Sequence, residues 1–230
     1  MMTASSSAAG LALVLALCGT AAHGAETYSY TIHHPQFGDI GTYTDRIERR
    51  DGGFTVETTV RVVVRALGMV LHREDAERRE LWRDGRLASF HGVTHINGKP
   101  VEVEGEARPD GFVVRSPDGT AVGPLDVVPA EPWQLGRLAG GVGGPVTGTL
   151  LSTRSGRLDS FRVTGGEPAR LPVQGITLTV RHYTVASDKH QEVWIDTRGV
   201  PVVFRTVENG APIDFTLSRE GVAALAALPP

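Results

Sequence analysis

The chain has 230 residues, of which 40% are apolar and 21% are charged, and its formal net charge at neutral pH is −3. This apolar content is ordinary for a protein with a hydrophobic core, and the length fits one large domain or two small ones. The slight acidic excess argues against a nucleic-acid partner, because proteins that bind nucleic acids neutralise phosphates with an excess of Lys and Arg.

The first 24 residues have the pattern of a signal peptide rather than of a folded segment. Residues 11–18 form an apolar run of suitable length, and Ala22 and Gly24 are small residues at the spacing that precedes a cleavage site. We therefore expect cleavage before Ala25. The run is too short to cross a bilayer, and no later segment has about 20 apolar residues. These features predict a mature chain without a transmembrane segment, located in the periplasm or secreted.

Cys18 is the single cysteine of the chain, and it lies inside the expected signal peptide. A lipoprotein signal would place a small residue directly before the cysteine, whereas Leu17 is large. The mature chain then has no disulfide and no cysteine metal site. Its stability must come from burial of a core, which about 200 residues can supply.

From Tyr28 onward apolar and polar residues alternate, with turn residues at short intervals, a pattern typical of β-strands. The clearest apolar face runs through Phe54, Val56, Val60, Val62 and Val64. Five dipeptides fit the positive φ angles of tight hairpin turns: Asp84-Gly85, Asn97-Gly98, Asp110-Gly111, Asp118-Gly119 and Asn209-Gly210. The spacing predicts an all-β protein in which an antiparallel meander forms a strongly curved sheet or an incomplete barrel.

Residues 69–82 allow two interpretations. Their charged run, residues 73–80, has high helix propensity. A valine-rich strand precedes the run and the Asp84-Gly85 turn follows it, so we favour one long strand. Because unpaired buried charges are costly, we expect this strand to be wet on both faces or to line an open concave face.

Residues 120–148 interrupt the alternation with several prolines and a run of glycines, which predicts an irregular crossover. A short helix is expected to begin at Pro132, since proline is tolerated in the first turn of a helix. Strands resume afterwards and continue to about residue 218. We therefore predict a single β-rich domain over residues 25–220, followed by a C-terminal tail, residues 221–230, that is helical for one turn or frayed.

Two hairpins that carry tryptophan, residues 80–90 and 192–204, organise this pattern. Shorter motifs accompany them, namely Tyr30-Thr31-Ile32, Gly38-Asp39-Ile40-Gly41, Val128-Pro129 and His182-Tyr183. Their order resembles a family of exported Gram-negative bacterial proteins known only as a domain of unknown function. The resemblance implies a β-rich open barrel similar to periplasmic lipoprotein-carrier folds, and it implies no activity.

Motifs for catalysis or metal binding are not recognisable in the sequence. It contains no Gly-x-Ser-x-Gly elbow and no phosphate-binding glycine loop. Among the eight histidines, His91 and His95 would lie about 13 Å apart on one strand, too far to share an ion. His182 and His190 could meet across a hairpin, but zinc needs three or four ligands. We expect no catalytic residue, no metal and no cofactor.

Acidic residues 102, 104 and 106 alternate with small and apolar neighbours, which favours a solvated strand face over an acid–base pair.

The aromatic residues are the strongest candidates for a functional role. Trp82 and Trp194 suit the role of core anchors better than that of cavity lining, whereas Trp133 suits both equally. We predict a non-enzymatic envelope protein whose concave surface binds an apolar or lipid-like ligand or an envelope protein, with Trp133 at the cavity mouth. The predicted ligand-binding residues are Trp82, Trp133, His182, Tyr183 and Trp194. The alternatives are a hydrolase or metal-dependent enzyme of unrecognised type, and an assembly module with a filled barrel.

Overall fold

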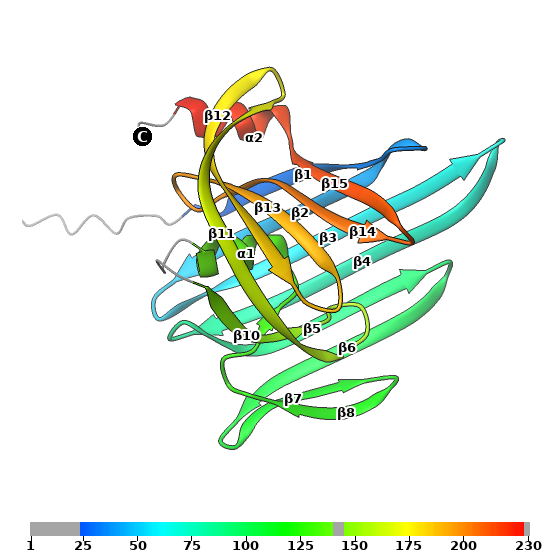
Figure 1. Ribbon diagram of the computed structural model, residues 1–230. Helices are drawn as coiled ribbons and strands as arrows, with labels where there is room; N and C mark the ends of the chain where they lie inside the picture. The colour runs from blue at the N-terminus through cyan, green and yellow to red at the C-terminus, as the bar shows by residue number, and fades with distance from the viewer. Residues whose placement is uncertain (1–23, 140–144, 228–230) are drawn as a thin grey trace, which may run out of the picture.

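The computed structural model describes residues 24–139 and 145–227 (Figure 1). The expected signal peptide lies outside these residues except for Gly24, and so does the glycine run at residues 140–144. The described residues form fifteen strands in one sheet and two helices.

The first half of the chain forms eight strands, which are β1 (Glu26–His34), β2 (Gly38–Arg50), β3 (Gly53–Ala66), β4 (Met69–Arg83), β5 (Arg86–Ile96), β6 (Lys99–Arg108), β7 (Gly111–Ser116) and β8 (Gly119–Gly123). The crossover contains β9 (Val128–Pro129) and helix α1 (Pro132–Ala139). The second half forms β10 (Val146–Leu151), β11 (Leu158–Val173), β12 (Ile176–Ala186), β13 (His190–Asp196), β14 (Pro201–Glu208), β15 (Ala211–Leu217) and helix α2 (Arg219–Ala227).

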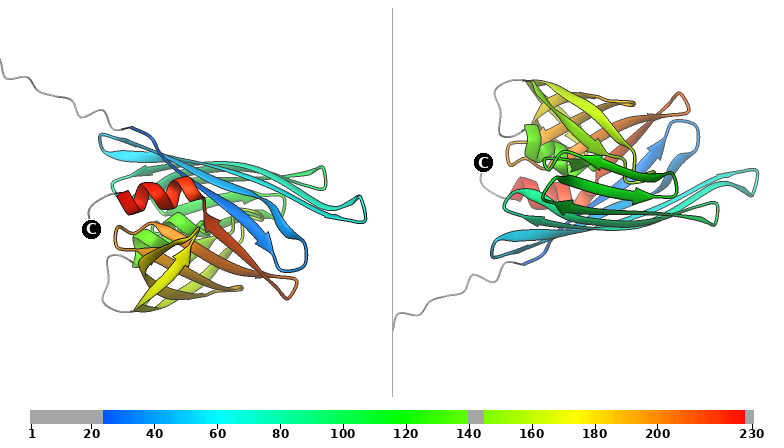
Figure 2. Two further views of the ribbon diagram at one scale, coloured as in Figure 1. Left: turned by 90° about the horizontal axis from the view of Figure 1, so that it is seen from above. Right: turned by 90° about the horizontal axis from the view of Figure 1, so that it is seen from below.

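The strands follow the order β8-β7-β6-β5-β4-β3-β2-β1-β15-β14-β13-β12-β11-β10-β9. All neighbours are antiparallel except β9 and β10, which are parallel. Strand β1 pairs with β15, so the two ends of the domain meet in the middle of the sheet. The sheet curves strongly, and β8 and β9 remain its edges in the described part (Figures 1 and 2). The predicted fold class, an incomplete all-β barrel with a short central helix, is confirmed.

Five hairpin turns share one backbone conformation, in which a residue with φ between 49° and 51° is followed by a glycine with positive φ. This is the conformation that a two-residue type I′ turn requires. Three of these turns are the predicted Asp84-Gly85, Asn97-Gly98 and Asn209-Gly210. The other two, Leu67-Gly68 and Gln174-Gly175, were not singled out by the sequence pattern.

The ambiguous segment is a strand, as favoured, because β4 extends from Met69 to Arg83. Its alternating residues divide into two sets. The outward set pairs on the exposed face, for example Arg73 with Asp75 at 2.7 Å and Glu77 with Arg61 at 2.8 Å. The inward set is buried and comprises Glu74, Ala76, Arg78, Glu80 and Trp82. Glu74 and Arg78 line the concave face, as the second of the two expected placements has it, whereas Glu80 is fully buried and departs from both.

Helix α1 covers one end of the concave face with an aromatic cluster. Trp82 stacks on Phe54 with ring centroids 5.5 Å apart and an interplanar angle of 5°. Trp133 of α1 packs edge-on against both rings, at 5.5 Å and 5.6 Å. Trp82 and Trp133 are 1% and 7% exposed, so this end of the sheet is filled by its own side chains.

The described part of the chain ends in helix α2, whose nine residues extend beyond the single helical turn expected for the tail. Val222 and Leu225 of α2 are buried, which anchors the helix on the sheet. Among the residues that the structure describes, no helix is both long and apolar enough to span a membrane.

The aromatic cluster predicts a large stability effect. Replacing Trp82 with alanine removes the central ring and leaves Glu80 without its indole donor, so we expect the free energy of unfolding to fall by about 3–5 kcal/mol. Val122 on β8 is 62% exposed, and Val122→Ala should change stability by less than about 0.5 kcal/mol. Urea denaturation followed by circular dichroism measures both values. A loss below about 1 kcal/mol for Trp82→Ala would show that the cluster is not a stabilising core.

Candidate functional site

The concave face of the sheet is hollow at the end opposite Trp82 and Trp133, where it holds a cavity of about 640 Å³. This volume lies within the range of about 300–1,000 Å³ typical of small-molecule sites. One wall comes from β1–β4 and the other from β14 and β15. Apolar side chains dominate these walls, among them Ile32, Ile40, Val62, Phe204, Ile213 and Phe215.

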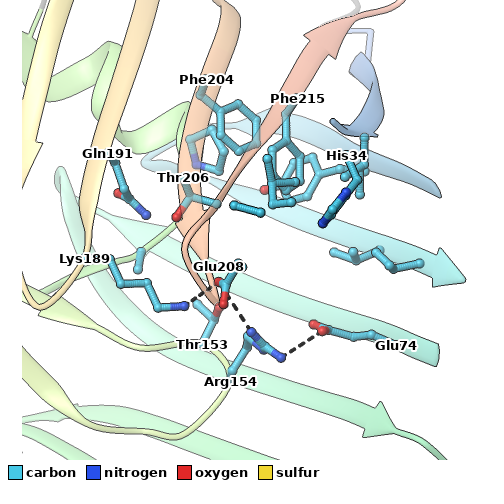
Figure 3. Close-up of a pocket in the computed structure, with 18 of the residues that line it drawn as sticks. His34, Glu74, Thr153, Arg154, Lys189, Gln191, Phe204, Thr206, Glu208 and Phe215 are labelled. Atoms are coloured by element: carbon cyan, nitrogen blue, oxygen red, sulfur yellow. Dashed lines mark hydrogen bonds and ion pairs between the residues drawn. The ribbon is translucent and has the colours of Figure 1, made fainter. Parts of the chain in front are cut away.

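Strand alternation explains why the walls are apolar. Val60, Val62 and Val64 occupy every second position of β3 and all three line the cavity, while the intervening Arg61 and Val63 lie on the opposite face of the strand. On the opposite wall the rings of Phe204 and Phe215 stack with centroids 4.1 Å apart (Figure 3). The site thus combines an aliphatic wall with an aromatic one.

The mouth of the cavity lies at one end of the sheet. Residues that line it come from four hairpin ends: Phe37 after β1, Leu71 at the start of β4, Asp188 between β12 and β13, and Asn209 after β14. Antiparallel pairing places these hairpin ends on the same side of the molecule.

A chain of ion pairs crosses the cavity near its mouth (Figure 3). Arg154, in the link between β10 and β11, contacts Glu74 of β4 at 2.9 Å and Glu208 of β14 at 3.7 Å. Lys189 pairs with the same Glu208. Apart from Glu74, these side chains are 36–38% exposed, so the pairs contribute little to stability. Their effect is to place polar groups from both walls around the opening.

A buried polar network closes the other end. The Arg78 guanidinium donates to Oε1 of Glu131 at 2.7 Å, and the Tyr43 hydroxyl donates to Oε2 at 2.7 Å. The side chains of Arg78 and Glu131 are 6% and 2% exposed. Since Glu131 directly precedes α1, this network fastens the crossover to β2 and β4.

Burial shifts two further carboxyls behind this network toward their neutral forms. Burial, reinforced by the negative charge of Glu131, raises the pKa of Asp45 to about 8. The same two causes raise the pKa of Glu80 well above its usual range. Oδ2 of Asp45 and Oε1 of Glu80 have no hydrogen-bond partner in the described part of the chain, which also favours the neutral forms.

The structure separates the five predicted ligand-binding residues into two groups. Trp82 and Trp133 form the closed end, whereas His182 stacks on Trp194 of the next strand, with centroids 4.6 Å apart. Tyr183 follows His182 on β12 and packs against the core. None of the five is among the described residues that line the cavity. Their role in ligand binding therefore stays a prediction.

Sequence reasoning missed the residues that form the cavity. The alternation of β3 identifies Val62 as inward-facing, but it does not show that the space opposite is empty. Arg154 and Lys189 gave no signal, because their partners Glu74 and Glu208 lie elsewhere in the sequence.

One cluster on the exposed face of β5 and β6 has the composition of a metal site. Ligand atoms of His91, Glu102 and Glu104 lie within 4.8 Å of one another. All three side chains are exposed, as predicted for the acidic face of β6, and His91 is hydrogen-bonded to Glu102 at 2.9 Å. The cluster is separate from the cavity, and nothing in its surroundings excludes water.

The buried carboxyls predict how stability depends on pH. Because the pKa of Asp45 is higher in the folded than in the unfolded chain, the folded state binds more protons between about pH 4 and pH 8. Stability should fall as pH rises through this window, by roughly 1 kcal/mol per pH unit from Asp45. Asp45→Asn keeps an acceptor for the Thr58 hydroxyl and removes one titrating group. The free energy of unfolding of this variant should therefore fall less steeply with pH.

Urea unfolding at several pH values between 5 and 8 measures the slope. Asp84→Asn is the matched control, since Asp84 lies in an exposed turn whose positive φ suits asparagine equally well. An Asp45→Asn slope equal to that of the unchanged chain would contradict a neutral, buried Asp45.

Comparison with one solved structure supports the architecture. A β-barrel-like protein of the domain of unknown function DUF1849 from Brucella abortus has a TM-score of 0.63 and 13% identity, covering 84% of this chain and 94% of that one. A DUF1089 family protein from Pseudomonas aeruginosa has a TM-score of 0.45 and 13% identity, with 70% and 87% covered. At this identity the first likeness shows a shared fold. None of the curated proteins matches the chain.

The sequence profile of one family spans almost all of the described sheet. It matches residues 30–218, which include both tryptophan hairpins, the cavity walls and the crossover. The predicted resemblance to a β-rich domain of unknown function is thereby confirmed, and the chain belongs to the family of the domain of unknown function DUF6134.

Proposed function

We propose that this protein is an exported binding protein without enzymatic activity, and that it holds a lipid-like amphiphile in the cavity. The observation that carries the proposal is the cavity itself, with apolar walls inside and charged side chains at its mouth. An amphiphile would place its hydrocarbon part between the two walls and its polar end among Glu74, Arg154 and Glu208. Export is proposed from the signal-peptide pattern of residues 1–24.

Burial of hydrocarbon supplies the affinity. Each methylene group transferred from water to an apolar environment contributes about 0.8 kcal/mol. The walls are regular strands of one sheet, so binding requires little ordering of the protein. Less of the favourable free energy of hydrocarbon burial is therefore lost to conformational entropy.

The charges at the mouth favour a particular polar end. Arg154 and Lys189 are already paired with Glu74 and Glu208. The carboxylates of Asp159, Asp188 and Glu192 also line the site, so acidic side chains outnumber basic ones there. We therefore infer that a zwitterionic or uncharged polar end is bound in preference to a simple carboxylate.

The polar network argues for binding over hydrolysis. Glu131 is the most deeply buried carboxylate among the described residues that line the cavity, and both of its oxygens accept hydrogen bonds, from Arg78 and Tyr43. A carboxylate engaged in this way serves to fasten α1 and is a poor general base, since both oxygens are occupied.

Filling the cavity should abolish binding. Val62→Trp places an indole in the site, whereas Val63→Trp adds the same ring to the opposite face of β3. We expect N-phenyl-1-naphthylamine to fluoresce on binding to the unchanged chain and to Val63→Trp, and its affinity for Val62→Trp to fall at least about tenfold, the equivalent of about 1.4 kcal/mol.

Competition then tests the class of ligand. Lysophosphatidylcholine should displace the dye at lower concentration than a fatty acid of equal chain length. Circular dichroism and the thermal midpoint establish that both variants are folded. The proposal fails if the unchanged chain does not bind the dye, or if Val62→Trp binds it equally well.

A further inference from the structure

The β3–β4 hairpin projects beyond its neighbours at the mouth end of the sheet (Figures 1 and 2). Its end, residues 65–73, is called the tip. Four large apolar side chains of the tip are exposed: Leu67 (96%), Met69 (61%), Val70 (52%) and Leu71 (52%). Single exposed apolar residues are common, but a cluster of them usually marks an interaction site.

The backbone conformation at Leu67 disfavours leucine, so the turn itself does not explain why leucine occupies this position. Its φ angle is 49°, in the left-handed region that disfavours residues with a Cβ atom, least for asparagine and aspartate. The four other turns of this type place a polar residue at the same position, namely Asp84, Asn97, Gln174 and Asn209. The tip thus has a strained leucine where the chain elsewhere uses a polar side chain. A contact outside the domain would account for its apolar character.

The charges of the tip indicate which kind of surface such a contact would involve. Residues 65–73 contain Arg65, His72 and Arg73 and no acidic residue, although the whole chain has a net charge of −3. Arg65 is exposed and forms no ion pair within the described residues, and Arg73 pairs with Asp75 outside the tip. Apolar side chains bordered by basic ones are complementary to a bilayer surface that carries anionic lipids.

We propose that the tip inserts into the surface of a membrane that contains anionic lipids. Leu67 and Met69 would enter the boundary between head groups and acyl chains, and Arg65 would contact lipid phosphates. Docking requires only the tip and therefore goes beyond ligand binding in the cavity. Val64 and Leu71 line the cavity at its mouth, so a docked tip would hold the mouth close to the bilayer.

Co-sedimentation with vesicles tests this inference through Leu67→Asn. Asparagine suits the left-handed turn, so this variant should keep or raise the thermal midpoint of the unchanged chain. We expect its affinity for vesicles of phosphatidylglycerol and phosphatidylcholine in equal amounts to fall about tenfold, as one leucine side chain is lost from the apolar boundary. Arg65→Gln should reduce the preference of the unchanged chain for these vesicles over pure phosphatidylcholine.

The matched control is Val122→Asn, which changes another exposed apolar residue, on β8, and should bind vesicles like the unchanged chain. All chains carry the same N-terminal residues, so any binding by that segment is common to them. Equal binding by Leu67→Asn would overturn the inference. Absence of vesicle binding by the unchanged chain would also overturn it. Dye binding in the cavity by Leu67→Asn should be normal, which separates this test from the test of the cavity.

Discussion

The buried ion pair between Arg78 and Glu131 is the interaction that divides the molecule into a closed end and an open end. It joins β4 to the residue before α1, and through Tyr43 it also reaches β2. Removing one partner of such a pair typically costs about 3–5 kcal/mol, because the other is left charged and buried. With the crossover held there, Trp133 fills the space beside Trp82, and the cavity begins where this packing stops.

The second constraint is that a sheet of fifteen strands remains open. A closed barrel has no edges, whereas an open sheet must protect the strands at each side. Here β8 has five residues and β9 has two, and β9 leads into α1, so both edges offer little backbone for unwanted pairing. The strongly curved sheet between them has two walls that face each other across a concave side. Their separation leaves room for a ligand where no helix enters.

Much of the fold follows from local patterns in the sequence. Alternation identifies the strands, Asp84-Gly85 and Asn97-Gly98 identify turns, and Pro132 identifies the start of α1. The candidate site does not follow in this way. Val62 has the same pattern whether the space opposite is filled or hollow, and the partners Arg78 and Glu131 are 53 residues apart. The tip was missed because leucine is not a turn-forming residue.

The central claim is that the concave side holds an amphiphile between β3 and the β14–β15 wall. Crystals grown with a lysophosphatidylcholine that carries bromine on its acyl chain test this most directly, since bromine is located by anomalous scattering. The account predicts a bromine peak between Val62 and Phe215, with the polar end near Arg154 and Glu208. A cavity collapsed by inward movement of these side chains, or a peak located only on the outer surface, would contradict it.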